Sequence, residues 1–188
     1  MRLPLLNPPY PPDVEHLFER MKRGTGREPL LLLRLFANHA NLWGRILPIS
    51  EFQLGPNSGL DLRTRELLIN RTCARCRCEY EWGVHATVFA GKAELTPGAL
   101  AATVNLASSD DTPLEISMVD ELHDAGTISD ALWQKLASRW SPAQILEMLV
   151  LIGWYHMISF VANAAGLPSE PWAERFPSQE QPSSIARD

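Results

Sequence analysis

The chain has 188 residues, 45% of them apolar and 21% charged, with a formal net charge of −5 at neutral pH. These values are typical of one globular domain with a sizeable core, and the acidic balance argues against a nucleic-acid partner, which requires a basic surface. A membrane-spanning helix is not expected, because the most apolar segment, 145–161, contains Glu147, Gly153 and His156. The clustered cysteines and the lack of a secretory signal pattern in the first residues predict a reducing, cytoplasmic setting.

Prolines, glycines and capping residues predict a series of short helices. Five prolines in residues 1–12 exclude a helix there and predict an extended arm that lies over this subunit or a neighbour. We expect helices at 13–23, 29–47, from 61 to a break near 73–76, and at 80–90, 97–104, 112–125, 129–136 and 141–165. Because no segment shows sustained two-residue alternation, the predicted fold class is all-α, with one helical domain over 13–168. Residues 169–188, rich in Pro, Ser, Glu and Gln, are expected to form a flexible tail.

Particular residues are expected to begin and end these helices. Asp61 is the predicted N-cap of the third helix, and Ser141 begins the longest one. Pro48 is expected to end the second helix, and Gly91 to follow the end of the fourth. Residues 24–26 and 108–111 are predicted turns.

The stretch CARCRCEYEWGVH, residues 73–85, holds all three cysteines together with two glutamates and a histidine. Cys78, Glu81 and His85 are spaced by three and four residues, so on a helix they share one face. Glu66 precedes Cys78 by 12 residues, roughly 18 Å along a straight helix. A turn between the two residues would bring Glu66 back to the same face.

Such a turn near Cys76 would also place Cys78 in the first turn of a new helix. The helix dipole favours a thiolate there, and His85 could exchange a proton with it. Cys73, Cys76 and Cys78 with His85 could instead bind a metal, although structural zinc sites generally use two separated ligand pairs. A redox Cys73/Cys76 pair and a helix that simply buries its thiols are further alternatives. No metal or cofactor is expected.

Aromatic and basic residues near this stretch supply candidate substrate contacts. Tyr80 and Trp82, together with Trp154 and Tyr155, suit a cavity for a flat substrate, although such residues are often core. His39 and His156 would line the same pocket if their helices pack on the Cys78 helix. Arg63 and Arg65, which precede this stretch, could bind a substrate carboxylate or form salt bridges.

The segments 63–70 (RTRELLIN) and 78–85 (CEYEWGVH), followed by Gly91 and Leu95-Thr96, resemble the carboxymuconolactone decarboxylase family, which includes the AhpD-like alkylhydroperoxidases. Residues 149–157, with Asn163 and Gly166, resemble the second core helix of its longer members. The similarity spans about residues 30–170. The resemblance implies an AhpD-like helical bundle, a small-molecule substrate, and a homodimer, trimer or hexamer.

The resemblance also assigns roles within the site. In the peroxidase branch a glutamate stands 12 residues before a Cys-x-x-Cys-x-x-x-His motif, and Glu66, Cys78 and His85 match three of its four positions. The second cysteine is replaced by Glu81, so the disulfide of that branch cannot form, although Cys73 or Cys76 could act as a substitute thiol. The decarboxylase branch carries a carboxylate at the Glu81 position.

Three functions therefore remain open at the level of sequence. The first is cofactor-free acid–base chemistry, of decarboxylase, lyase or isomerase type, on a small organic acid, lactone or aromatic-like substrate. The second is a peroxidase that uses Cys78. The third is a non-catalytic helical oligomer that binds a ligand or scaffolds a partner. In the first two, Glu66, Cys78, Glu81 and His85 form the catalytic set.

Overall fold

Helices make up most of the part of the chain that the structure describes. The structure, a computed structural model, describes residues 1–22, 28–105, 109 and 111–177. Its elements are α1 (Pro12–Lys22), α2 (Leu31–Phe36), the 3-10 turn η1 (Ala37–His39), α3 (Ala40–Gln53), α4 (Leu62–Arg75), α5 (Glu79–Val88), α6 (Pro97–Asn105), α7 (Leu114–Ala125), α8 (Asp130–Arg139) and α9 (Pro142–Ala165). The all-α prediction is confirmed. The predicted turn at 24–26 lies outside the described residues, as do residues 108 and 110 of the one at 108–111.

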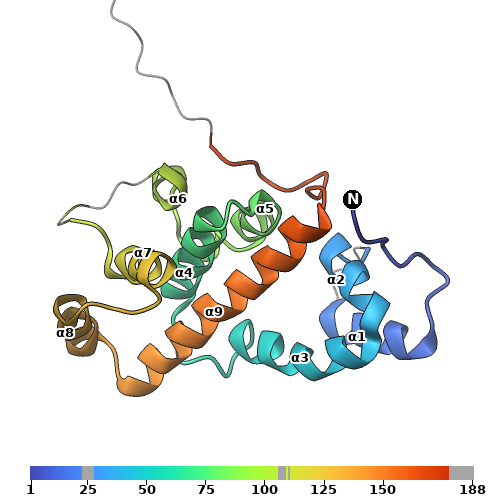
Figure 1. Cartoon of the computed structure of the whole chain (residues 1–188), viewed down its shortest axis with the longest axis horizontal. Helices are drawn as coiled ribbons and strands as arrows, with labels where there is room; N and C mark the ends of the chain where they lie inside the picture. The colour runs from blue at the N-terminus through green and yellow to red at the C-terminus, as the bar shows by residue number, and fades with distance from the viewer. Residues whose placement is uncertain (23–27, 106–108, 110, 178–188) are drawn as a thin grey trace, which may run out of the picture.

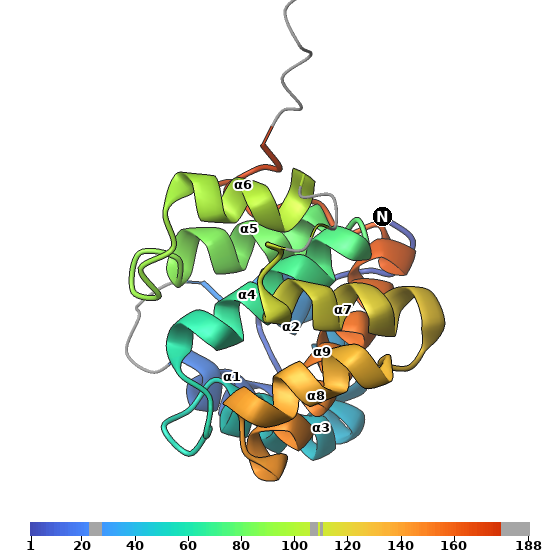
Figure 2. The same ribbon diagram turned by 90° about the vertical axis from the view of Figure 1, so that its left-hand side faces the viewer.

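Helix α4 lies at the centre of the bundle and packs against α5, α6, α7 and α9 (Figures 1 and 2). Asp61 caps it as predicted, because its carboxylate accepts a hydrogen bond from the Thr64 N–H at 2.9 Å. Every residue from 64 to 73 is buried, as expected for a helix with neighbours on all sides. A buried ion pair fixes α4 to α7: the Arg71 guanidinium donates to both carboxylate oxygens of Asp120, at 2.7 and 2.8 Å.

Helix α9 is the longest element and runs beside α4 across the whole bundle (Figure 1). Its predicted start is confirmed by a capping box between Ser141 and Gln144, and its end by Gly166, whose φ of 67° is left-handed. By length and composition α9 resembles a membrane span, but core helices of soluble proteins pass the same test, and α9 buries one face against α4. Its outer face leaves Leu146, Val150 and Phe160 exposed.

The segment expected to be one helix over 29–47 is two helices. The chain leaves helical geometry at His39, with φ −137° and ψ 68°, and the His39 Nδ1 accepts a hydrogen bond from the Leu42 N–H at 3.3 Å. This side chain therefore caps α3. The break at η1 turns the chain so that α3 can pack against α1.

Pro48 does not end this helix, contrary to expectation. Helix α3 continues five residues further, to Gln53. A proline inside a helix removes one backbone hydrogen bond, and Trp43 and Leu47 hold the helix in a small core against α1. The expectation for Gly91 also fails. Helix α5 ends with Phe89 as its C-cap, so Gly91 is not the residue directly after the helix end.

A left-handed turn separates α4 from α5, slightly later than predicted. Arg77 has φ 54°, and the Arg77 N–H donates to the Ala74 carbonyl at 2.9 Å. The Cys78 N–H donates to the Cys73 carbonyl at 2.8 Å. These two hydrogen bonds form the Schellman arrangement that closes a helix. Cys76 thus ends α4, and Cys78 is the N-cap of α5.

Both terminal segments pack on the helical body of their own chain. The N-terminal arm is fixed by hydrogen bonds from the Leu6 N–H to the Arg34 carbonyl and from the Arg2 N–H to the Ala165 carbonyl. In the segment expected to be a flexible tail, residues 169–177 are anchored instead, because Glu170 is buried and accepts from the Leu31 N–H at 2.7 Å. The rest of that segment, 178–188, lies outside the described residues.

Candidate functional site

A buried chain of polar side chains joins three helices at the middle of the bundle. Because α5 folds back beside α4, the His85 Nδ1 lies 2.7 Å from Glu66 Oε2. The other ring nitrogen, Nε2, lies 3.1 Å from the hydroxyl of Tyr155 on α9. All three residues are at most 2% exposed. The geometry is that of a histidine held in one orientation by a carboxylate on one side and a phenol on the other.

The charges around His85 favour its protonated form. Burial alone would lower its pKa, but the Glu66 carboxylate, its hydrogen bond to the ring and the nearby Glu81 carboxylate outweigh burial and raise the pKa to about 9. The imidazolium therefore predominates at neutral pH, with Nδ1–H donating to Glu66. Glu66 is itself positioned by Arg65, whose Nε donates to Oε1 at 3.1 Å.

Glu81 lies one helical turn before His85 and completes the group. Its Oε1 is 3.5 Å from His85 Nε2, while its Oε2 is buried and has no hydrogen-bond partner within the described part of the chain. An unpaired buried carboxylate oxygen is costly for folding. It is also an acceptor that a ligand or a proton could satisfy.

A cavity of about 700 Å³ opens onto this group. Glu81, His85 and Tyr155 meet on its wall. The other polar lining residues are Glu28, Ser50, Glu51, Thr87 and Lys92, and the rest of the wall is apolar. The apolar wall includes Leu32, Phe36, Trp43, Leu47, Trp154 and Trp172. A mainly apolar cavity with a few convergent polar groups is the usual form of a small-molecule site.

Cys78 is not part of this wall. Its side chain is fully buried, and burial, followed by the nearby Glu81 charge, raises the pKa of the thiol to about 11, despite a hydrogen bond from the backbone of Glu81. We expected a lowered pKa from its place at a helix start; desolvation outweighs the dipole here. All three cysteines are free.

Tyr80 and Trp82 serve the packing of the bundle rather than the cavity wall. The Tyr80 hydroxyl accepts from the Leu32 N–H at 3.0 Å and donates to Glu170 Oε1 at 2.7 Å. The Trp82 Nε1–H donates to the Thr103 hydroxyl at 2.9 Å. Neither side chain lines the cavity, and both tie α5 to its neighbours.

The other candidate contacts also lie elsewhere. His39 caps α3, and His156 lies 2.9 Å from His123, outside the cavity wall. Arg63 donates to the Glu94 carbonyl at 2.7 Å, and Arg65 forms the salt bridge with Glu66. Of the two roles considered for Arg65, substrate binding and a salt bridge, the structure shows the salt bridge.

The metal set considered from sequence is not assembled around His85. Both of its ring nitrogens are engaged by Glu66 and Tyr155. Cys76 instead approaches His123 and His156. The contact of Tyr155 with His85 and this second cluster were not predicted from sequence, because each joins helices far apart in the chain and leaves no spacing signal.

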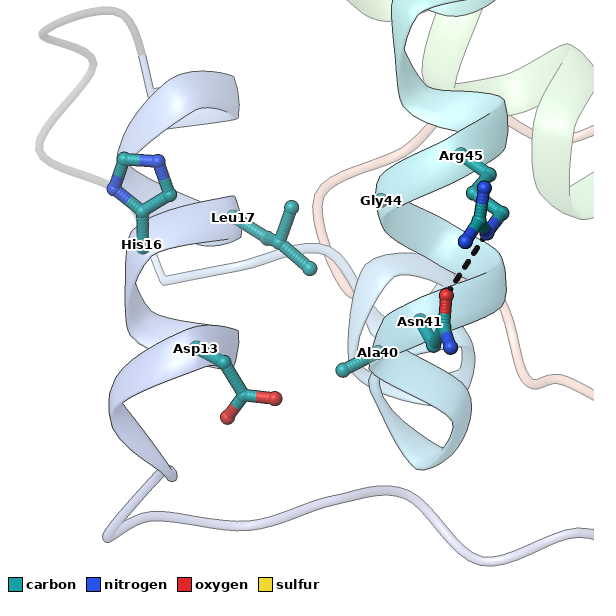
Figure 3. A pocket seen from close by; sticks show the side chains of 7 residues that line it. All are labelled: Asp13, His16, Leu17, Ala40, Asn41, Gly44 and Arg45. Carbon is teal, nitrogen blue, oxygen red and sulfur yellow. Dashed lines mark hydrogen bonds between the residues drawn. The ribbon is translucent and has the colours of Figure 1, made fainter.

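A second depression, of about 470 Å³, lies between α1 and α3 (Figure 3). Asp13 and His16 line it from α1, and Asn41 and Arg45 from α3, where the Arg45 Nε–H donates to the Asn41 side-chain oxygen at 3.0 Å. These polar side chains are all exposed. The depression is a surface hollow, and none of the groups around His85 lines it.

Sequence and structure comparisons place the chain among known proteins. Residues 48–120 match the carboxymuconolactone decarboxylase family. Among functionally curated proteins, none is significantly similar to the chain in sequence. The fold is similar to that of an uncharacterized peroxidase-related protein from Silicibacter sp. TM1040, with TM-score 0.73, 18% identity, and 91% of each chain covered.

A second solved structure shares the fold over a smaller part of the chain. It is a protein of unknown function from Agrobacterium tumefaciens, described as a candidate antioxidant defence protein AhpD. The TM-score is 0.61 at 15% identity, and the match covers 72% of this chain and 94% of that one. At these identities the two likenesses establish a shared helical fold.

Proposed function

Because residues 48–120 belong to the carboxymuconolactone decarboxylase family and the chain has the AhpD-like fold, we propose that the protein is a cofactor-free acid–base enzyme for a small organic acid or lactone. The observation that carries the proposal is the meeting of Glu81, His85 and Tyr155 on the wall of one largely apolar cavity. Fold alone does not fix a reaction, so the proposal rests on this group of side chains.

Two ionisable groups that lie next to each other on the wall, Glu81 and His85, are suited to opposite tasks. Glu81 Oε2, which has no partner among the described residues, is the proposed base that takes a proton from the carbon next to a substrate carbonyl. His85, whose pKa is raised to about 9 by Glu66 and Glu81 against the effect of burial, is the proposed acid. Environments that separate an acid from a base in this way allow both to act at one pH.

Tyr155 links the acid to the substrate. The His85 Nε2–H can donate to the Tyr155 oxygen at 3.1 Å, which leaves the phenol hydrogen available to an oxygen in the cavity. Burial, and then the Glu81 and Glu66 charges, raise the pKa of Tyr155 well above its usual value, so it remains a neutral donor. It would stabilise the enolate oxygen that forms when the base removes the proton.

The same arrangement accommodates isomerisation and decarboxylation. In an isomerisation, the proton that Glu81 removes returns to another carbon of the enolate. In a decarboxylation, the carbon–carbon bond breaks, its electron pair remains on the substrate as an enolate, and carbon dioxide leaves. A proton from His85 then neutralises the carbanion, and solvent returns a proton to His85.

Solvent deuterium exchange tests the proposal directly. Small β-keto acids and unsaturated γ-lactones are incubated with the protein in deuterium oxide, and label at the carbon next to the carbonyl is followed by proton NMR. Glu81→Gln and His85→Gln should each slow exchange by about 10²–10⁴-fold. Cys78→Ala is the matched control in the same helix and should retain activity. Exchange that survives both cavity variants, or that requires Cys78, contradicts the proposal.

A thiol peroxidase is the second candidate, favoured by the peroxidase-related and AhpD descriptions of the similar structures. The Cys78 thiolate would attack a peroxide, giving a sulfenic acid and an alcohol, and a second thiol would displace water to form a disulfide. The burial and raised pKa of Cys78 argue against this step. Mass spectrometry after one equivalent of peroxide decides, because a sulfenic acid or disulfide at Cys78 would support the peroxidase.

A further inference from the structure

Three side chains from three helices form a second cluster, separate from the cavity. They are Cys76 at the end of α4, His123 in the last turn of α7 and His156 in α9. One donor atom from each lies within 4.8 Å of the other two. All three residues are half-buried, so ions from solvent can reach them. Thiolate and imidazole are the ligands that zinc prefers.

Hydrogen bonds already orient two of these ligands. The His156 Nδ1–H donates to the Ile152 carbonyl at 2.9 Å, so its Nε2 carries the lone pair, and this atom lies 2.9 Å from His123 Nδ1. Metal-binding histidines characteristically donate their second ring N–H to a carbonyl or carboxylate. The backbone of Cys76 is held as well, because its carbonyl accepts from the Asn163 side-chain amide at 2.8 Å.

We propose that Cys76 Sγ, His123 Nδ1 and His156 Nε2 bind one divalent transition-metal ion, zinc first, with water as the fourth ligand. On binding, the Cys76 thiol releases its proton to solvent and His123 carries its proton on Nε2 instead of Nδ1. At usual zinc bond lengths a tetrahedral site separates two nitrogens by about 3.3 Å and nitrogen from sulfur by about 3.6 Å. The two imidazoles therefore have to separate by a few tenths of an ångström.

The charges around the cluster favour the neutral form of the His123 ligand. Burial, the Arg75 guanidinium and the neighbouring His156 lower the pKa of His123, although Asp124 and Asp120 oppose this effect. The Cys76 thiol loses its proton less easily than a free thiol, because burial raises its pKa. Metal binding would therefore release a proton from sulfur.

The bound metal would join α4, α7 and α9. Two of these helices, α4 and α9, also carry Glu66 and Tyr155. Metal binding does not depend on the reaction at His85, because none of the three ligands lines the cavity. A metal that binds the folded state and not the unfolded one raises the unfolding temperature.

Cobalt titration of the full chain, after removal of metal by a chelator, tests the proposal. Cobalt should bind with one equivalent and give a thiolate charge-transfer band together with the visible bands of a tetrahedral site. Zinc should then displace cobalt and raise the unfolding temperature of the protein by on the order of 5 °C.

Variants locate the metal. Cys76→Ser should abolish the charge-transfer band, and His123→Gln and His156→Gln should each weaken binding by about tenfold or more. Cys78→Ala and His16→Gln, a buried thiol and an exposed imidazole outside the cluster, should bind as the parent does. If His156→Gln does not fold, the half-buried His123→Gln decides. Failure of the parent protein to bind either metal, or full binding by Cys76→Ser and His123→Gln, overturns the proposal.

Discussion

Tyr155 and His156 are neighbours on α9, yet they belong to two clusters of opposite electrostatic character. Tyr155 faces the fully buried pair of Glu66 and His85, where two carboxylates overcome burial and raise the pKa of His85 to about 9. His156 faces the half-buried His123, whose pKa is lowered by burial, Arg75 and His156 itself. One histidine is thus prepared to give up a proton, and the other to offer a lone pair. The partner residues, rather than the histidines, decide which task each can perform.

The largest expected effect follows from removing the carboxylate that charges His85. In Glu66→Gln the pKa of His85 should fall from about 9 towards or below its ordinary value, because burial then acts with less opposition. NMR titration of the His85 ring measures this change directly. Proton exchange of the substrate probes should fall by about 10²-fold or more, with a shifted pH profile.

The second cluster supplies the control for this prediction. His123→Gln should leave both the His85 titration and the exchange rate unchanged, since it lies outside the cavity wall. If His85 still titrates near pH 9 in Glu66→Gln, Glu66 does not set its protonation.

The next effect is a dependence of stability on pH. The folded-state pKa of His85, about 9, lies above the ordinary value of 6.5, so its stabilisation is fully present below pH 6.5 and is lost as pH rises to 9. The difference corresponds to roughly 3 kcal/mol in the free energy of unfolding. Denaturant unfolding at pH 6.5 and pH 9 measures it.

The comparison between parent and variant isolates the contribution of the buried cluster. The drop in stability between the two pH values should be much smaller in Glu66→Gln. Equal drops in the two proteins would assign the pH dependence to other groups.

A smaller difference is expected between the alkylation rates of the cysteine in the half-buried cluster and the two fully buried cysteines. In the native protein, iodoacetamide should modify the half-buried Cys76 about tenfold or more faster than the fully buried Cys73 and Cys78. Peptide mapping by mass spectrometry reads the order. Zinc should protect Cys76 if the metal binds there. Labelling of Cys78 ahead of Cys76 would mean that the buried thiol is reached more readily than its exposure indicates.

The smallest effect is expected at the half-buried cluster without metal. Here His123→Gln should change the free energy of unfolding by no more than about 0.5 kcal/mol, because it removes one partly exposed hydrogen bond. The same variant should lose the added stability that zinc gives the parent protein. Denaturant curves with chelator and with zinc distinguish the two cases. A large loss in the metal-free state would show that the pair of imidazoles is itself structural.

Local signals in the sequence predict the helices well where caps determine the ends. Asp61 and Ser141 cap α4 and α9 through side chains that act within a few residues. The sequence predicts one helix where the structure has α2 and α3, because the break between them depends on the His39 side chain and on packing against α1. Pro48 misleads for the same reason, since tertiary contacts outweigh a single lost hydrogen bond.

The site is predicted only in part, because sequence spacing reports contacts within a helix or across one turn but not contacts between distant helices. Glu66, Glu81 and His85 are brought together through one turn and one helix face, which spacing can suggest. Tyr155 comes from a helix 70 residues further on, and spacing does not report such a contact. The prediction for Cys78 was wrong in its pKa, because helix position is visible in sequence whereas the depth of burial is not.

The cavity wall takes residues from three distant parts of the chain, including Phe36, Val84 and Trp172. The Glu66–His85 pair, in contrast, needs only α4 and α5, which follow each other in the chain. The wall is complete only with Trp172, in the segment where Glu170 joins Leu31 to Tyr80. The pair that charges His85 is therefore local in the chain, whereas the enclosure of the cavity around it depends on the last segment that the structure describes.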